Sequence, residues 1–215
     1  MSQEARFSRM ETELRKANLI EATLVCLKRH GFQGASIRKI SAEAGVSVGL
    51  ISHHYSGKDE LVAEAYRAIT GRVMSLLRDA MEHAAPNARE RLSAFFRGSF
   101  SAELLDPQLI DAWLAFWGAV RTAESINLAH EHSYGEYRGI LRKVLTELAQ
   151  EESWENFDAD LAAISLSALL DGLWLESGLN PGTFTPEQGI QICEAWVDGL
   201  QAGGRQRFCV QTTGC

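Results

Sequence analysis

The chain has 215 residues, of which 46% are hydrophobic and 23% charged. This composition is typical of a folded globular protein and excludes collagen-like, mucin-like and largely disordered chains. The net charge of −7 is unevenly distributed: residues 1–70 carry ten Lys or Arg against eight acidic residues, whereas residues 71–215 carry the remaining eleven against twenty. This asymmetry suggests an N-terminal part (the front end) that can contact phosphate groups, followed by an acidic C-terminal part (the body) with a different function.

The sequence also restricts where the protein works. Charged or small polar residues interrupt every apolar run before the roughly 18 residues that a membrane span needs, and the first residues, MSQEARFSRMETELRK, lack the apolar segment of a secretory signal. We therefore expect a soluble, cytoplasmic protein without membrane contact. Four cysteines without a C-x-x-C pair predict neither a zinc ribbon nor a disulfide scaffold, and no metal site is expected. They are Cys26, Cys193, Cys209 and Cys215.

Apolar residues recur at helical spacing in almost every segment, and helix-capping residues separate the segments. In chain order, helices are expected over 14–30, from Ser36 to Gly45, after Ser47, from 57 to about 84, after Asn87, from Asp106 through Trp117, over 124–150, over 159–177, and from Thr185 to about Gly199. The predicted fold is all-α with about nine helices. We expect a helix-turn-helix domain over 1–60, linked by the 57–84 helix to a ligand-binding and dimerisation domain over 61–202, and a flexible tail over 203–215.

Two short predicted helices at the front end are joined by the tight turn Gly45-Val46-Ser47. Glycine permits the turn, apolar residues hold the helices together, and the second helix is free to enter a major groove. Residues on and around these helices are predicted to contact DNA: Ser36, Ile37, Ser47, Val48, Gly49, Leu50, Ser52 and His53.

Phosphate contacts are expected from polar and basic residues around the second helix and on the first helix. Such contacts fix register and do not read sequence. The predicted residues are Arg15, Lys16, Arg38, His54, Tyr55 and Lys58. A solvated surface charge is the simpler interpretation of any one of them taken alone.

A competing motif lies in the same stretch. Residues 45–49, GVSVG, match G-x-S-x-G, the nucleophile elbow of serine hydrolases, with Ser47 as the nucleophile. That elbow needs a buried strand before the serine, whereas Ile37–Ala44 has helical spacing and includes Arg38 and Lys39. We therefore expect no enzyme activity. His53 and His54 point about 100° apart on a helix, so they do not readily share a metal ion.

The segment over residues 15–66 resembles the DNA-binding domain of TetR-family transcriptional repressors. The motifs that carry the resemblance are ASI at 35–37, ISAEAGVS at 40–47, and His54-Tyr55 followed by Lys58. The common family form has Tyr-Phe where this chain has His54-Tyr55. The resemblance implies a homodimer whose recognition helices enter successive major grooves about 34 Å apart, and an effector pocket in the body.

Aromatic and acidic residues gather in two segments of the body. Trp113, Phe116 and Trp117 share a segment with Asp111, and Trp174 follows Asp171 by three residues. Such residues suit a diffuse cation, because each aromatic face contributes roughly 0.5–2 kcal/mol of cation–π attraction. Aromatic residues at helical spacing more often pack a core, so both interpretations stay open here.

The stretches LAFWGAV and ALLDGLWLESGL resemble the BetI subgroup, the choline-responsive repressors of glycine betaine synthesis genes. This resemblance implies choline or a related methylated amine as the effector, no further cofactor, and a role in osmotic stress. The candidate ligand residues are Asp111, Trp113, Phe116, Trp117, Tyr134, Tyr137, Asp171 and Trp174. A TetR-type regulator of efflux or lipid metabolism, with structural tryptophans, is the alternative.

Dimerisation is predicted for the last two helices. Residues 159–177 are apolar on nearly every side, which is more than one domain face can bury. Trp196 on the last helix is expected to serve as an interface anchor, and Trp174 is a second candidate for that role.

Overall fold

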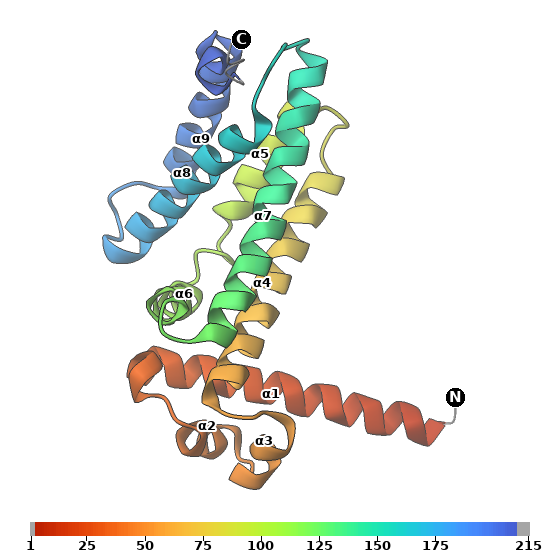
Figure 1. Ribbon diagram of the computed structural model, residues 1–215, viewed down its shortest axis with the longest axis vertical. Coiled ribbons are helices and arrows are strands. Elements are labelled where there is room, and N and C mark those ends of the chain that lie inside the picture. The colour runs from red at the N-terminus through yellow and green to blue at the C-terminus, as the bar shows by residue number, and fades with distance from the viewer. Residues whose placement is uncertain (1–2, 210–215) are drawn as a thin grey trace, which may run out of the picture. The chain divides into compact units, whose positions relative to one another are not determined.

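The computed structural model describes residues 3–209, with side chains from Leu14 onward. Within that range the chain forms nine α-helices and one short 3₁₀ helix, and its only β-pairing is an isolated bridge between Phe157 and Cys209 (Figure 1). The all-α prediction is confirmed. The elements are α1 (Gln3–Gly34), α2 (Ile37–Ala44), α3 (Val48–His54), α4 (Lys58–Glu82), α5 (Ala88–Ser99), α6 (Pro107–Val120), α7 (Glu124–Glu151), α8 (Ala159–Leu179), α9 (Pro186–Gln201) and η1 (Gly204–Phe208).

Capping side chains set most of the helix starts where the sequence places them. Ser36, Ser47 and Asn87 each accept a hydrogen bond from a backbone N–H three residues later, and Thr185 forms a full capping box with Gln188. At the start of α4, the Ser56 backbone N–H donates to the Glu60 carboxylate over 2.5 Å.

The helices form two compact units. The reader unit comprises the chain up to Gly71 together with Asp111–Ser133, and the body unit comprises Arg72–Ile110 together with the chain from Tyr134 onward. These units differ from the predicted division near residue 60, since α4, α6 and α7 each contribute to both. The physical reason is packing within the reader unit, where Phe116 of α6 meets the fully buried Tyr66 of α4 edge-on at 5.1 Å between ring centroids.

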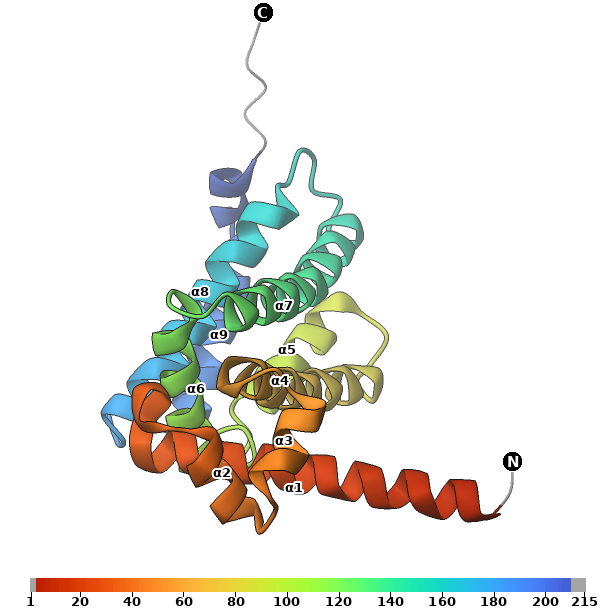
Figure 2. The ribbon, with the colours of Figure 1, turned by 60° about the horizontal axis from the view of Figure 1, so that its bottom comes forward.

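Within the reader unit, α2 and α3 lie together against α1 (Figures 1 and 2). Ile40 of α2 and Ile51 of α3 are completely buried, as is Leu61 at the start of α4. Burying each such side chain contributes roughly 1.5–3 kcal/mol, which holds the short helices at a fixed angle although each is too short to be stable alone.

The body unit has its own apolar core, formed by α5, α7, α8, α9 and the second half of α4. Phe95 and Phe96 are fully buried at its centre. Helices α5 and α9 pack closely at Gly189, where an added Cβ would lie 2.6 Å from the Phe100 ring. Arg89 of α5 also forms ion pairs with Glu194 and Asp198 of α9.

Helix α8 is long and apolar enough to cross a membrane by length and composition, with a mean hydropathy of 1.2 over its best window. Asp160, Asp171 and Glu176 interrupt its apolar run, as the sequence predicts. A core helix of a globular protein passes the same test, and Leu166 and Leu170 of α8 are buried in the body unit.

The predicted flexible tail over 203–215 differs from the structure. Residues 204–208 form η1, whose Phe208 ring packs on Trp196 at 5.9 Å, and the Asp158 backbone N–H donates to the Phe208 carbonyl. Aromatic packing therefore orders this segment. Residues 210–215, with Cys215, lie outside the described residues.

Candidate functional site

The turn between α2 and α3 has the geometry of a helix-turn-helix. Gly45 adopts the left-handed conformation (φ 66°, ψ 29°), which a residue with a Cβ rarely adopts, and its N–H caps the carbonyls at the end of α2. The Val46 N–H then donates to the Ser41 carbonyl over 3.0 Å. These contacts turn the chain sharply within residues 45–47, and α3 begins directly after its cap, Ser47.

The first turn of α3 is exposed. Val48 is 41% exposed although it is apolar, and Gly49, Ser52 and His53 are also exposed. A Cβ added at Gly49 would meet only the Ser47 hydroxyl at 3.9 Å, so nothing in the reader unit blocks approach to this backbone. Ile37 and Leu50 are half-buried and contribute to the packing beneath this face.

The predicted phosphate contacts fall into two kinds. Arg38 and His54 are exposed. Lys16 of α1, by contrast, forms an ion pair of 2.5 Å with Glu64 of α4, which also pairs with Arg67 at 2.7 Å. The hydrogen bond from Lys16 is the main reason that the pKa of Glu64 lies below its usual value. Lys16 would therefore have to share its charge between Glu64 and a phosphate.

Lys58 also has a partner within the reader unit. Its ammonium group donates to the Phe32 carbonyl over 3.0 Å and lies 4.0 Å from the centroid of the Phe32 ring. Lys39 similarly donates to the Gly34 carbonyl over 2.8 Å. Two lysines thus satisfy carbonyls at the C-terminal end of α1, where cations are favoured. Sequence reasoning missed this structural role, because carbonyl partners leave no sequence signal.

Tyr55 lies at the C-terminal cap of α3 and is half-buried. Burial raises the pKa of its phenol, and the nearby charge of Glu64 raises it further. The phenol is therefore uncharged near neutral pH and can donate a hydrogen bond to a phosphate oxygen.

Ser47 does not stand in a nucleophile elbow. Residues 37–44 before it form α2, not a strand, and the Ser47 hydroxyl oxygen accepts the Leu50 N–H over 3.2 Å as the cap of α3. The match to G-x-S-x-G is therefore explained by the helix-turn-helix.

The candidate ligand residues separate into two clusters. The reader cluster is an aromatic group on α6 and α4, in which the Trp113 and Trp117 rings lie 6.3 Å apart and Trp113 meets Tyr66 edge-on at 5.3 Å. Phe116 is fully buried. Tyr66 was not predicted, because its spacing on α4 is that of an ordinary core position.

Polar groups support Tyr66 from α7. Its hydroxyl is hydrogen-bonded to His130 Nδ1 at 2.9 Å, and one turn further on Thr70 shares a 3.1 Å hydrogen bond with Ser133. Both pairs join α4 to α7 within the reader unit. Buried hydrogen bonds of this kind fix the register of two helices, since a shifted helix would leave polar groups unsatisfied.

Asp111 lies apart from the aromatic rings. Its carboxylate is exposed and pairs with Lys28 at 3.7 Å. A solvated ion pair contributes little to binding a further cation, so Asp111 is less suited to this task than the sequence predicts.

The body cluster brings together three of the other four predicted residues, Tyr134, Tyr137 and Asp171, and Trp174 lies one turn after Asp171 on α8. The Tyr134 hydroxyl donates a short hydrogen bond to the Asp171 carboxylate, and the Tyr134 and Tyr137 rings lie 6.0 Å apart. Trp174 donates its indole N–H to the Ser99 carbonyl over 2.9 Å. This hydrogen bond uses the edge of the indole ring, so its faces can pack against other groups. Burial raises the pKa of Asp171, and the bond from Tyr134 and the charge of Arg138 oppose this shift.

Family profiles match both parts of the chain. Residues 19–65 match "Bacterial regulatory proteins, tetR family", and residues 88–202 match "BetI-type transcriptional repressor, C-terminal". The HTH-type transcriptional regulator BetI of Escherichia coli is 35% identical over 172 residues, covering 78% of this chain and 84% of the relative. The protein of the same name from Vibrio campbellii is 30% identical over 187 residues, covering 86% and 92%.

Solved structures share the fold. A candidate transcriptional regulator from Pseudomonas aeruginosa PAO1 is 74% identical and superimposes with a TM-score of 0.90, covering 96% of this chain and all of that one. More distant is a regulator from Saccharomonospora viridis in complex with choline, at 22% identity and a TM-score of 0.71 over 89% of this chain and 97% of that one. FadR from Bacillus subtilis in complex with stearoyl-CoA, at 19% identity, has a TM-score of 0.72 over 87% and 98%.

A capped helix-turn-helix joined to a helical body defines a helix-turn-helix transcriptional regulator. Both profiles and the curated relatives agree with that class. The chain belongs to the TetR family of transcriptional repressors and has a BetI-type C-terminal domain. The family resemblance predicted from residues 15–66 is confirmed.

Proposed function

We propose that this repressor acts in the cytoplasm as a homodimer that binds double-stranded operator DNA through α3, and that choline or a related methylated amine weakens this binding. Its targets are then genes of glycine betaine synthesis. The observation that carries the DNA part is the exposed first turn of α3, with Val48 41% exposed beside a glycine. An apolar side chain at that position is suited to contact with base edges in a major groove.

The effector part rests on the chemistry of the two clusters. Tryptophan faces attract quaternary ammonium groups, and the half-buried carboxylate of Asp171 supplies a negative charge that a cation would compensate. The E. coli and Vibrio relatives bear the name BetI, and the regulator from Saccharomonospora was crystallised with choline. These likenesses favour a cation over other effectors.

The homodimer is supported by an apolar stripe on α8. Its six positions follow one another at spacings of three or four residues, and the stripe stays on one face of the helix over its whole length. Four of the positions hold apolar side chains that are 36–58% exposed. The residues of the stripe are Leu161, Ile164, Ala168, Gly172, Leu175 and Leu179. Such a face favours an isologous contact with a second copy. Trp196 is less suited to be the anchor, because Phe208 of the same chain packs on it.

The alternative effector is a lipid or another efflux-type ligand. FadR with stearoyl-CoA shares the fold about as closely as the regulator with choline, and the fold alone does not choose between them. The observation that favours a cation is the buried acidic group of the body cluster, because an acyl chain with an anionic head would be repelled by it. A serine hydrolase using Ser47 has no supporting observation.

The decisive experiment titrates choline into the protein alone and into its complex with DNA from beside its own gene. We expect choline to change tryptophan fluorescence and to shift the operator complex toward free DNA, while stearoyl-CoA does neither. Trp113→Leu should abolish the fluorescence change if the reader cluster binds the cation, and Asp171→Asn should weaken choline binding if the body cluster does. Trp154→Phe is the matched control, because Trp154 belongs to neither cluster and packs on Phe157.

Two results would reject the effector assignment: no fluorescence change up to millimolar choline, or an operator complex that choline leaves intact. Mapping the bound DNA decides the target genes separately. If the protected site does not lie beside genes of betaine synthesis, the pathway assignment is wrong even where choline binds.

A further inference from the structure

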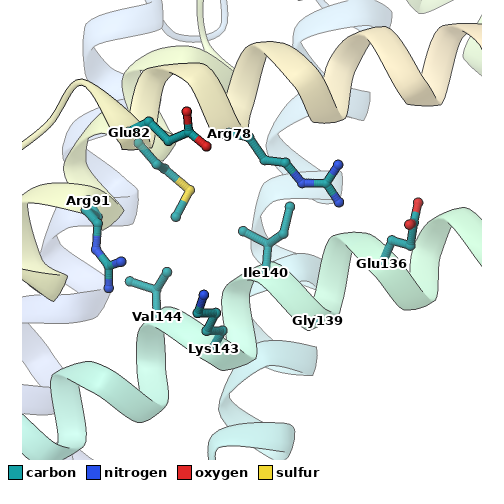
Figure 3. Close-up of a pocket in the computed structure, with 9 residues that line it drawn as sticks. Arg78, Glu82, Arg91, Glu136, Gly139, Ile140, Lys143 and Val144 are labelled. Carbon is teal, nitrogen blue, oxygen red and sulfur yellow. The ribbon is translucent and has the colours of Figure 1, made fainter.

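A hollow in the body unit contains none of the candidate ligand residues. It has a volume of about 420 Å³ and lies between α4, the first turn of α5 and α7 (Figure 3). This volume falls within the range of small-molecule sites in proteins. The hollow is open to solvent, so a small ligand needs no rearrangement to enter.

The floor of the hollow is apolar. Met81 of α4 and Ile140 and Val144 of α7 line it, and Val144 is only 2% exposed. Gly139 lies on the same face of α7, and a Cβ added there would meet no atom within 4 Å. The missing side chain thus leaves open space beside the backbone, which a short alkyl group would fill.

Basic groups converge on this floor from three helices, although residues 71–215 are acidic as a whole. Arg91 of α5 is already neutralised by an ion pair with Glu147. Arg78 of α4 and Lys143 of α7 extend into the space between their helices, and neither forms an ion pair or hydrogen bond with any residue of the described part of the chain (Figure 3).

Two carboxylates also line the hollow. In Figure 3, Glu82 lies on α4, and Glu136 lies on α7 on the far side of Gly139 and Ile140 from Lys143. Their charges disfavour a polyanion and favour a single negative charge beside Lys143, away from Glu136.

We propose that this hollow binds a small amphipathic monoanion, a carboxylate carrying a short alkyl group. The anionic head lies at Lys143, the alkyl group covers Met81, Ile140 and Val144, and Arg78 adds positive charge to the hollow. Charge-assisted hydrogen bonds fix the head, while apolar burial stabilises the tail. The site is separate from the cation clusters and would make the body responsive to a second class of metabolite.

The test is calorimetric titration of the full-length protein with three probes of equal chain length: hexanoate, hexyl phosphate and hexyltrimethylammonium. We expect hexanoate to bind with one-to-one stoichiometry, and hexyl phosphate, which carries nearly two negative charges near neutral pH, to bind more weakly. The proposed cation clusters are also expected to bind hexyltrimethylammonium, so this probe serves as a control whose binding Lys143→Ala should not weaken. The anion titrations need neither DNA nor choline, so their outcome does not depend on the proposed regulatory function.

Three variants locate the site. Lys143→Ala should weaken anion binding about tenfold, the loss expected for one charge-assisted hydrogen bond, and Gly139→Leu should weaken it by occupying the open space. Both positions are solvent-accessible on α7, and leucine and alanine favour helix, so thermal unfolding should confirm folded variants. Arg97→Ala, an exposed basic residue of α5 outside the hollow, should bind as the wild type does.

The proposal is overturned if hexanoate does not bind at about ten times millimolar concentration, on the order of the weakest specific affinities. It is equally overturned if hexyl phosphate binds more tightly than hexanoate, because Glu82 and Glu136 would then not disfavour a second negative charge. Anion binding that survives both Lys143→Ala and Gly139→Leu would show that the anion binds elsewhere.

Discussion

Replacing Asp171 by asparagine separates the charge of the body cluster from its shape. Asparagine keeps the size of the side chain and still accepts the hydrogen bond from Tyr134. Only the negative charge is removed. If Asp171 compensates a bound cation, the variant loses an attraction of about 3 kcal/mol at an effective dielectric constant of roughly 20 and a separation of about 5 Å. Partial exposure reduces this value, so we expect the Kd for choline to rise about tenfold or more.

The pH dependence gives the second readout. Burial raises the pKa of Asp171 above its ordinary value of 3.8. Only the ionised carboxylate attracts a cation, so choline affinity of the wild type should increase as pH rises through this raised pKa, and the variant should lack that increase. Stability moves the opposite way. A carboxyl group with a raised folded-state pKa stabilises the fold below its unfolded pKa and loses that contribution as pH rises.

The Asp171→Asn variant should therefore become more stable relative to the wild type as the pH increases. Isothermal titration measures the Kd for choline from about pH 4, near the ordinary pKa of an aspartate, to about pH 8, and thermal unfolding over the same range measures stability. Equal Kd values for wild type and variant at every pH would refute Asp171 as the counter-charge. A variant that is less stable at high pH would refute the burial argument.

The remaining predictions concern DNA binding and assembly. Lys58→Ala should weaken binding to all DNA sequences and lower the salt slope by about one unit, measured by fluorescence anisotropy; an unchanged slope with lower thermal stability would assign Lys58 only to its contacts with Phe32. Ser47→Ala should cost about 1 kcal/mol of stability through the lost cap and weaken operator binding, and its hydrolysis of a chromogenic ester should equal that of the wild type. Ile164→Asp, at a position 48% exposed in one chain, should convert the dimer to monomer in sedimentation experiments; a dimer that persists would place the interface elsewhere.

Local features of the sequence predicted the helices well. The caps at Ser36, Ser47, Asn87 and Thr185 are interactions between residues three apart, and such short-range preferences are encoded locally. Helix ends are less well defined locally. Helix α1, expected over 14–30, already begins at Gln3, and its helical backbone is interrupted at Gly31 (φ 62°, ψ 177°), directly after the predicted end, before a short continuation to Gly34.

The sequence predicted which residue types the candidate site contains, but not which residues they contact. Trp113, Trp117, Asp171 and Tyr134 stand out in the sequence by their chemistry. The sequence gives no sign that Tyr66 lies against Trp113, since the contact joins positions 47 residues apart through packing of α4 on α6.

The sequence by itself therefore determined the helices, their caps, the helix-turn-helix and the family, since each depends on residues close together in the chain. Only the tertiary structure decided which charges are neutralised and which are available. It paired Asp111 with Lys28 and Lys58 with the end of α1, and it gathered Arg78, Arg91 and Lys143 around one apolar floor. The physical reason is that electrostatic and packing partners are set by distance in space, and segments remote in sequence meet only when the helices fold together.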